Sequence, residues 1–162
     1  MCSSDLSKQT LKYDEQGRNI GWAYFGVDGK PCLDSYGVAK YVRQCDEQGR
    51  RIKEFYFGVD DKPCLNTLGC SIFTVKYDER GNEIEIAHFD VNGKPCLRQY
   101  GYSIIRTKYN ERGNRIEVAY FGVDGKPCLC DGGFSKITWQ YDEHGKAIET
   151  SYFDVEGKRI DR

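Results

Sequence analysis

The chain repeats itself at a fixed step of 32 residues, and this period constrains its fold more than any other feature. The segment 109–129, YNERGNRIEVAYFGVDGKPCL, shows the pattern in full, and no insertion or deletion interrupts the register between copies. A glycine and an isoleucine three residues later recur in all five copies: Gly17, Gly49, Gly81, Gly113, Gly145 and Ile20, Ile52, Ile84, Ile116, Ile148. Self-similarity at a period of roughly 20–50 residues indicates an array of stacked structural units.

Each copy predicts two β-strands joined by a tight turn. Before the first turn of the third copy, Phe73, Val75 and Tyr77 alternate with polar residues. A period of two in aromatic and β-branched residues is typical of a half-buried strand. The Asp-Glu-x-Gly that follows the first strand predicts a type I turn with a bulge, whose left-handed position favours glycine. The second strand is expected from Ile20 to Phe25 and at the equivalent positions of the other copies.

A second turn and a return segment complete the repeat. Val27-Asp28-Gly29-Lys30 predicts another hairpin turn, because Asp-Gly is among the strongest short hairpin signals. The second copy has Asp61 in place of this glycine, and aspartate holds the left-handed conformation at some cost. Pro-Cys-Leu then predicts a short extended segment at an edge or a strand start, because proline cannot donate to a ladder. A loop containing Gly37 or its equivalent returns the chain to the next repeat.

These signals together predict an all-β fold, since no segment has an amphipathic helical period. We expect a tandem array of β-hairpins, solenoid-like or an extended meander sheet, with five units of period 32. A single hairpin is marginally stable in water, and stacking on its neighbours buries its apolar face. The expected organisation is one repeat domain over residues 1–162, with units at approximately 9–36, 37–68, 69–100, 101–132 and 133–162.

Charge and composition exclude two classes of partner. With 24 basic and 25 acidic residues, the chain carries a net charge of −1, which argues against nucleic-acid binding. No apolar run approaches the ~20 residues of a membrane helix, so no membrane partner is expected. The start, MCSSDLSKQT, lacks the basic and apolar regions of a signal peptide. This predicts a cytoplasmic protein, although a signal removed earlier would leave no trace.

The eight cysteines are interpreted as free thiols in a reducing compartment. Cys32, Cys64, Cys96 and Cys128 are equivalent, and stacked hairpins would separate neighbours by ~9.6 Å. A disulfide needs Cα atoms within roughly 7 Å. Disulfides and metal binding remain the alternatives, but a zinc site usually needs two Cys-x-x-Cys pairs and the chain has only Cys128-x-Cys130.

No other group of residues predicts a metal, a cofactor or catalysis. Asp90-Val91-Asn92-Gly93 is similar to the opening of a calcium loop, but the rest of that loop is absent and a hairpin turn is favoured. The histidines, His88 and His144, do not recur and form no evident pair with a nucleophile. We therefore expect no metal site, no cofactor, no catalytic residue and no enzymatic activity.

Two short segments resemble known repeat families. Tyr13-Asp14-Glu15-Gln16-Gly17-Arg18 and Tyr77-Asp78-Glu79-Arg80-Gly81-Asn82 resemble the YD repeats of bacterial RHS-type proteins. Residues 24–30 and 120–126 are similar to the aromatic hairpins of choline- and glucan-binding cell-wall repeats. The resemblance implies arrays of hairpins in extended sheets or shells, with a structural or binding role. The period of 32 is longer than in either family, and Pro-Cys-Leu belongs to neither pattern.

The repeated Tyr-Phe pair is the candidate binding feature. Neighbouring strand residues point to opposite faces, so each pair should place one ring on each side. An exposed row of rings would suit a glycan or a protein, whereas rings buried between layers would serve the core. The candidate residues are Tyr24, Tyr56, Tyr120, Tyr152, Phe25, Phe57, Phe121 and Phe153. We expect a scaffold or protein-interaction module whose partner is a protein or a neighbouring domain. The alternative is a carbohydrate-binding module that stacks glycan rings on one row.

Overall fold

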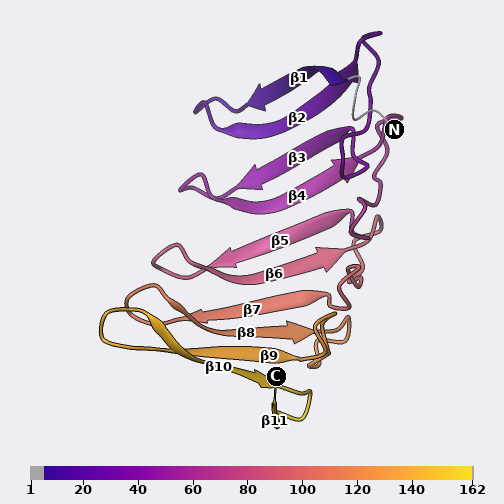
Figure 1. Ribbon diagram of the computed structural model, residues 1–162. Helices are drawn as coiled ribbons and strands as arrows, with labels where there is room; N and C mark the ends of the chain where they lie inside the picture. The colour runs from indigo at the N-terminus through magenta and orange to yellow at the C-terminus, as the bar shows by residue number, and fades with distance from the viewer. Residues whose placement is uncertain (1–5, 162) are drawn as a thin grey trace. The chain divides into compact units, whose positions relative to one another are not determined.

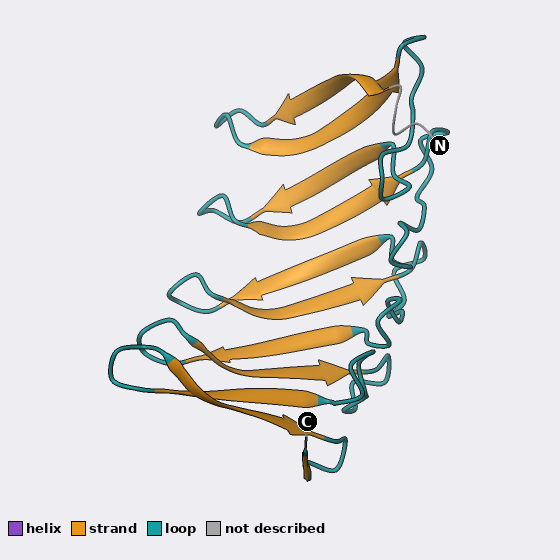
Figure 2. Ribbon diagram, viewed as in Figure 1, coloured by secondary structure: helices purple, strands orange, loops and turns teal. Residues whose placement is uncertain are grey.

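The predicted all-β array of hairpins is confirmed. The computed structural model describes residues 6–161 and contains eleven strands, with no helix among those residues (Figures 1 and 2). The strand order in the sheet follows the chain order, and neighbouring strands are antiparallel. The strands are β1 (Leu6–Tyr13), β2 (Asn19–Gly26), β3 (Lys40–Cys45), β4 (Arg51–Phe57), β5 (Ile72–Tyr77), β6 (Glu83–Phe89), β7 (Ile104–Tyr109), β8 (Arg115–Phe121), β9 (Lys136–Tyr141), β10 (Ala147–Phe153) and β11 (Arg159–Ile160).

The described residues fall into two compact units. The first unit contains residues 6–74 and 88–94, and the second contains residues 75–87 and 95–161. Strands β1 to β4 therefore belong to the first unit, and β7 to β11 belong to the second. Each unit includes several copies of the repeat, so equivalent positions can be compared between them.

Three turns in every complete repeat have the same backbone geometry. In the first repeat they span residues 14–18, 26–30 and 34–38. In each turn, the N–H of the first residue donates to the carbonyl of the fifth, and the N–H of the fourth donates to the carbonyl of the first. The fourth residue has a φ of about 75°, as at Gly17. Asp61 occupies this position with a φ of 61°, as the sequence predicted. The third turn was expected only as an irregular loop.

The recurrent isoleucine occupies a β-bulge next to the first turn. Lys12 pairs with Gly21 and Tyr13 with Asn19, so Ile20 is left out of the β1–β2 register. The same one-residue shift leaves out Ile52, Ile116 and Ile148 in the other ladders. A bulge of this kind increases the local twist of the strand. Ile148 is 62% exposed, so the position of isoleucine in the bulge explains its recurrence better than burial in the core does.

The Pro-Cys segment folds back onto the strand that precedes it. Pro31 bridges to Phe25, and the Cys32 N–H donates to the Tyr24 carbonyl at 3.0 Å. The chain then leaves the sheet through the third turn and returns at Ala39, whose carbonyl accepts the N–H of Tyr24. The predicted short extended segment is confirmed, and the residues after it form an excursion that we call the return turn. Figure 2 shows the return turns at the opposite end of the strands from the first turns.

Small side chains fill the point where each return turn rejoins the sheet. Val38 and Ser103 are completely buried, and Ala39 and Ser71 are nearly so. Successive return turns also hydrogen-bond to one another within each unit. The Thr67 N–H donates to the Tyr36 carbonyl in the first unit, and the Asp131 N–H donates to the Tyr100 carbonyl in the second. Within the part of the chain that the structure describes, no helix is long and apolar enough to cross a membrane.

Candidate functional site: the two faces of the sheet

The two predicted aromatic rows lie on opposite faces of the strands. The cross-strand pairs Trp22–Tyr41 and Tyr41–Tyr56 place the tyrosine row on one face, which we call the aromatic face. Lys40 pairs with Phe57, which places the phenylalanine row on the other face, here called the lysine face. The alternation expected within each Tyr-Phe pair is therefore present.

The tyrosine row is packed against other aromatic rings. Tyr56 is 7% exposed and contacts Tyr41 with 5.2 Å between ring centroids, whereas Tyr24, Tyr120 and Tyr152 are half-buried. In the second unit, two of the rings that contact this row come from the return turns. The centroids of Tyr102 and Tyr120 lie 5.0 Å apart, as do those of Phe134 and Tyr152. The return turns therefore supply side chains that cover part of this row.

The phenylalanine row is covered by basic side chains. Lys40 Nζ lies 4.8 Å from the ring centroid of Phe57, and Arg106 Cζ lies 4.4 Å from that of Phe121. Lys136 makes the same contact with Phe153, at 4.5 Å. Each cation–π contact contributes about 0.5–1 kcal/mol at an exposed site. The row is half-buried throughout, so a stacking ligand would have to displace these cations.

The aromatic face of the first unit contains a buried charge that the sequence analysis missed. Glu54 is 3% exposed, and its Oε2 accepts a hydrogen bond from Arg43 Nε at 2.5 Å. Arg51 Nη1 lies 3.7 Å from the same oxygen. Arg43 also lies over Trp22, with 4.4 Å to the ring centroid. These side chains form one network in which aromatic rings and a carboxylate alternate with cations.

Return-turn residues extend this network by a hydrogen bond. The Tyr41 hydroxyl donates to Asp34 Oδ2 at 2.5 Å, and Trp22 Nε1 donates to the Tyr24 hydroxyl at 3.0 Å. Burial, followed by the hydrogen bond to Asp34, raises the pKa of Tyr41 well above its usual range. Tyr41 is therefore a neutral hydrogen-bond donor near neutral pH.

In the second unit the aromatic face is apolar and forms a shallow groove. The groove has a volume of about 360 Å³. Its apolar and aromatic lining includes Ile105, Val118 and Trp139, and charged side chains are supplied by Glu83 and Arg115. The other lining residues are Ile86, Thr107, Tyr109, Tyr120, Phe134 and Ile137. The sequence offered one signal for the groove, because Thr107 and Val118 replace the charged residues found two repeats earlier.

A second exposed apolar feature lies along the return turns. The valine of each second turn and the leucine of each Pro-Cys-Leu segment are exposed in every copy that contains them. We call these residues the Val–Leu edge; Val27, Val59, Val91, Leu33 and Leu65 belong to the first unit, and Val123, Val155, Leu97 and Leu129 to the second. Val27 is the most exposed, at 79%, and Leu65 is 51% exposed. The leucine recurs visibly in the sequence, but its exposure does not follow from the sequence pattern.

The cysteines act as packing residues in this arrangement. No disulfide joins the seven cysteines between residues 6 and 161, and Cys2 lies outside the described residues. The Cys128 thiol donates to the Gly101 carbonyl at 3.5 Å, and Cys64 makes the equivalent contact with Gly37. Burial raises the pKa of both thiols, which keeps them protonated near neutral pH.

The remaining candidate metal ligands and histidines either have structural roles or lie apart from one another. Among residues 6–161, no three His, Cys, Asp or Glu side chains form a group that could hold a metal ion. The Asp90 carboxylate accepts the N–H groups of Asn92 and Lys94, both at 2.8 Å, so this segment is a hairpin turn. His88 is buried, whereas His144 is exposed and lies 3.4 Å from the Glu143 carboxylate.

Comparison with known proteins adds no family to this description. Neither a protein-family model nor a curated protein sequence matches the chain. Three extended surfaces remain as candidate sites. The surfaces are the Val–Leu edge, the groove of the second unit and the lysine face.

Proposed function

We propose that this protein is a non-enzymatic scaffold or protein-interaction module that engages a protein partner along its Val–Leu edge. The observation that supports the proposal is the repeated exposure of the same valine and leucine positions within each unit. Equivalent residues in adjacent hairpins are spaced by ~9.6 Å, since each repeat adds two strands. Large exposed apolar patches mark interaction sites, and the repeat brings exposed valines and leucines together along one edge of each unit.

The partner is either a neighbouring domain or a separate chain, and site-specific photo-crosslinking tests both sources. A photo-reactive phenylalanine analogue is placed at Leu65 in one variant and at Leu129 in another, and cells producing each variant are irradiated. We expect the same partner to be captured from both positions, because they are equivalent in the repeat. Gln16, in the exposed first turn, serves as the control position, where no such adduct is expected.

A charge substitution then distinguishes a specific partner from incidental contact. Leu97→Glu alters the edge next to Leu129 without removing a buried side chain, because Leu97 is 50% exposed. This variant should lose the adduct formed from Leu129 while keeping its thermal unfolding temperature. Adducts that persist in Leu97→Glu, or that form equally well from Gln16, would show that the edge is not an interaction surface.

Carbohydrate binding is the second candidate, and the groove of the second unit is the observation that favours it. Tyr109 and Trp139 line the groove beside Glu83 and Arg115, which combines ring faces with hydrogen-bonding groups. Affinity electrophoresis through gels containing a soluble β-glucan provides the test. Retardation that is lost in Trp139→Ala, but kept in Trp22→Ala of the first unit, would establish this function in place of the first.

A further inference from the structure

The lysine face of the second unit is built on ion pairs between neighbouring strands. Lys108 Nζ lies 2.9 Å from Glu117 Oε1, and Lys76 Nζ lies 2.8 Å from Glu85 Oε1. Arg106 Nε also lies 2.8 Å from the second oxygen of Glu85. Burial raises the pKa of Glu85, but its hydrogen bonds to Lys76 and Arg106 outweigh this effect and the pKa is lowered. In these repeats, a glutamate on the second strand neutralises a lysine on the first.

The first repeat keeps the lysines of this arrangement and lacks its carboxylate. Lys12 and Lys40 are equivalent to Lys108 and Lys136, but Gly21 stands where the fourth repeat has Glu117. Lys12 pairs directly with Gly21 across the β1–β2 ladder. Within the described residues, Lys12 is exposed and makes no ion pair.

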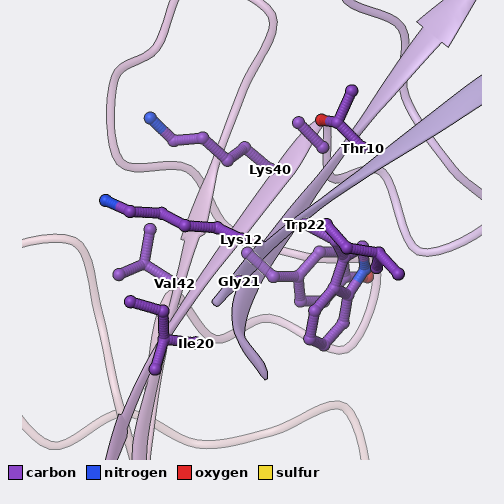
Figure 3. Close-up of a pocket in the computed structure, with 10 residues that line it drawn as sticks. Thr10, Lys12, Ile20, Gly21, Trp22, Lys40 and Val42 are labelled. Atoms are coloured by element: carbon purple, nitrogen blue, oxygen red, sulfur yellow. The ribbon is translucent and has the colours of Figure 1, made fainter. Parts of the chain in front are cut away.

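A hollow lies beside Gly21 and Lys12. Its volume is about 220 Å³, and its lining on this face includes Thr10, Lys12, Gly21, Lys40 and Val42. None of its described lining residues is acidic. Figure 3 shows Lys12 and Lys40, from the two strands that flank β2, extending in the same direction, while Trp22 points to the other side. A Cβ added at Gly21 would lie 2.6 Å from the Tyr41 carbonyl oxygen, so the close backbone approach excludes a side chain there.

The charge around the hollow is positive. Lys8 and Lys53 lie on the same face of the first unit, and the strand residues described there include no acidic side chain. Asp61, in the second turn of the next repeat, pairs with Lys40 and is the nearby exception. Lys40 also lies over Phe57, so its position is already set, whereas Lys12 has no such contact among the residues that the structure describes. The face therefore offers an unneutralised ammonium group beside a hollow of side-chain size.

We propose that this hollow binds a carboxylate side chain from an acidic segment of a partner protein. The fourth repeat shows the ion pair that such a carboxylate would reproduce, since Glu117 Oε1 lies 2.9 Å from Lys108 Nζ. A glutamate entering from solvent would complete the ion pair that Gly21 leaves open. Its neighbours in the partner would meet the ammonium groups of Lys8 and Lys53. This site is separate from the Val–Leu edge, and its test does not depend on that surface.

Fluorescence anisotropy with a fluorescein-labelled hexaglutamate peptide tests the proposal. The full chain should bind the peptide more weakly as salt rises, because the contacts are exposed ion pairs. Lys12→Ala should weaken binding up to about fivefold, the range expected for one surface ion pair, and Lys12→Glu should weaken it further. Lys108→Ala is the matched control and should leave the affinity unchanged, because Glu117 already neutralises Lys108.

A gain-of-site variant provides an independent check. Glu117→Gly removes the internal carboxylate while leaving Lys108, Lys136 and the nearby Arg106, and should create a second peptide site in the fourth repeat. In ¹⁵N-NMR titrations, hexaglutamate should shift the amides of residues 10–12 and 21–23 in the native protein. In Glu117→Gly it should also shift residues 106–108 and 117–119.

Three outcomes would overturn the proposal. The first is hexaglutamate binding that is equally strong in Lys12→Glu and in the native protein. The second is a pattern of shifted amides centred away from residues 10–23. The third is binding of inorganic phosphate, but not of hexaglutamate, in a Lys12-dependent manner, which would assign the hollow to a free oxyanion.

Discussion

Replacing Arg43 with threonine should destabilise the first unit strongly, because it leaves the Glu54 carboxylate buried with one cation fewer. The Glu54 side chain is 4% exposed and that of Arg43 is 27% exposed. Removing one partner of a buried pair typically costs about 3–5 kcal/mol. Arg51 remains 3.7 Å from the carboxylate, so we expect a loss of about 2–3 kcal/mol in the free energy of unfolding. The lost cation–π contact with Trp22 adds about 0.5–1 kcal/mol.

The second unit supplies the matched replacement for both residues. Thr107 and Val118 form the equivalent cross-strand pair two repeats further along. Glu54→Val alone should cost only about 1 kcal/mol, because the two arginines it leaves are partly exposed and reach water. The double variant Arg43→Thr/Glu54→Val should come within about 1 kcal/mol of the native protein, since apolar replacement of a buried ion pair is often neutral. The cycle therefore predicts a coupling of about 3 kcal/mol between the two positions.

Urea unfolding followed by tryptophan fluorescence measures the four proteins of this cycle. Trp139 is replaced by phenylalanine in all of them, so that the signal comes from Trp22 beside Arg43 in the first unit. The denaturant dependence of the unfolding free energy should stay constant, which confirms that the native and unfolded states are unchanged in compactness. Two single substitutions whose effects simply add, or an Arg43→Thr protein as stable as the native one, would refute the reasoning.

Three further predictions concern the turns and the buried hydroxyls. Asp61→Gly should raise the thermal unfolding temperature, because it removes a left-handed aspartate that costs up to about 1 kcal/mol. Gly29→Ala should lower that temperature, although the added Cβ would meet nothing within 4 Å. Shifts of the two variants in the same direction would contradict this reasoning. The side-chain hydrogen bond from Asn82 lowers the pKa of Asp78, so its contribution to stability is present above pH 3.8 and is lost as the pH falls through the folded-state pKa. An NMR pH titration should find that pKa below the one measured in Asn82→Ala. Burial raises the pKa of Tyr56, so its contribution to stability is present below pH 10 and is lost as the pH rises. Ultraviolet absorbance should therefore show the ionisation of Tyr56 only together with unfolding.

The fold was largely predictable because its signals are local. A period of two in Phe73, Val75 and Tyr77 indicates a strand whatever lies beside it, and a left-handed position excludes most residues other than glycine. Even the exception at Asp61 was placed correctly, since a short polar side chain tolerates that conformation. The return turn was missed as a turn because only its glycine recurs strictly, while its other residues vary from copy to copy.

The surfaces were harder to predict because each depends on strands that are distant in the sequence. Alternation showed that Tyr120 and Phe121 face opposite ways, but not that Arg106 covers one ring and Tyr102 the other. The burial of Glu54 depends on the cross-strand pairing that places Arg43 against it. Nor did the sequence pattern show that Leu65 is exposed.

The sequence by itself determined the period, the strands, the turns and the two-sidedness of each hairpin, since these follow from backbone preferences within a few residues. Tertiary structure alone decided which side chains are covered and which charges are neutralised. Lys12 and Lys108 are the same residue in the same repeat position, yet one faces Gly21 and the other faces Glu117. Ion pairing and burial arise between neighbouring strands, so identical local sequences acquire different surfaces from the strands beside them.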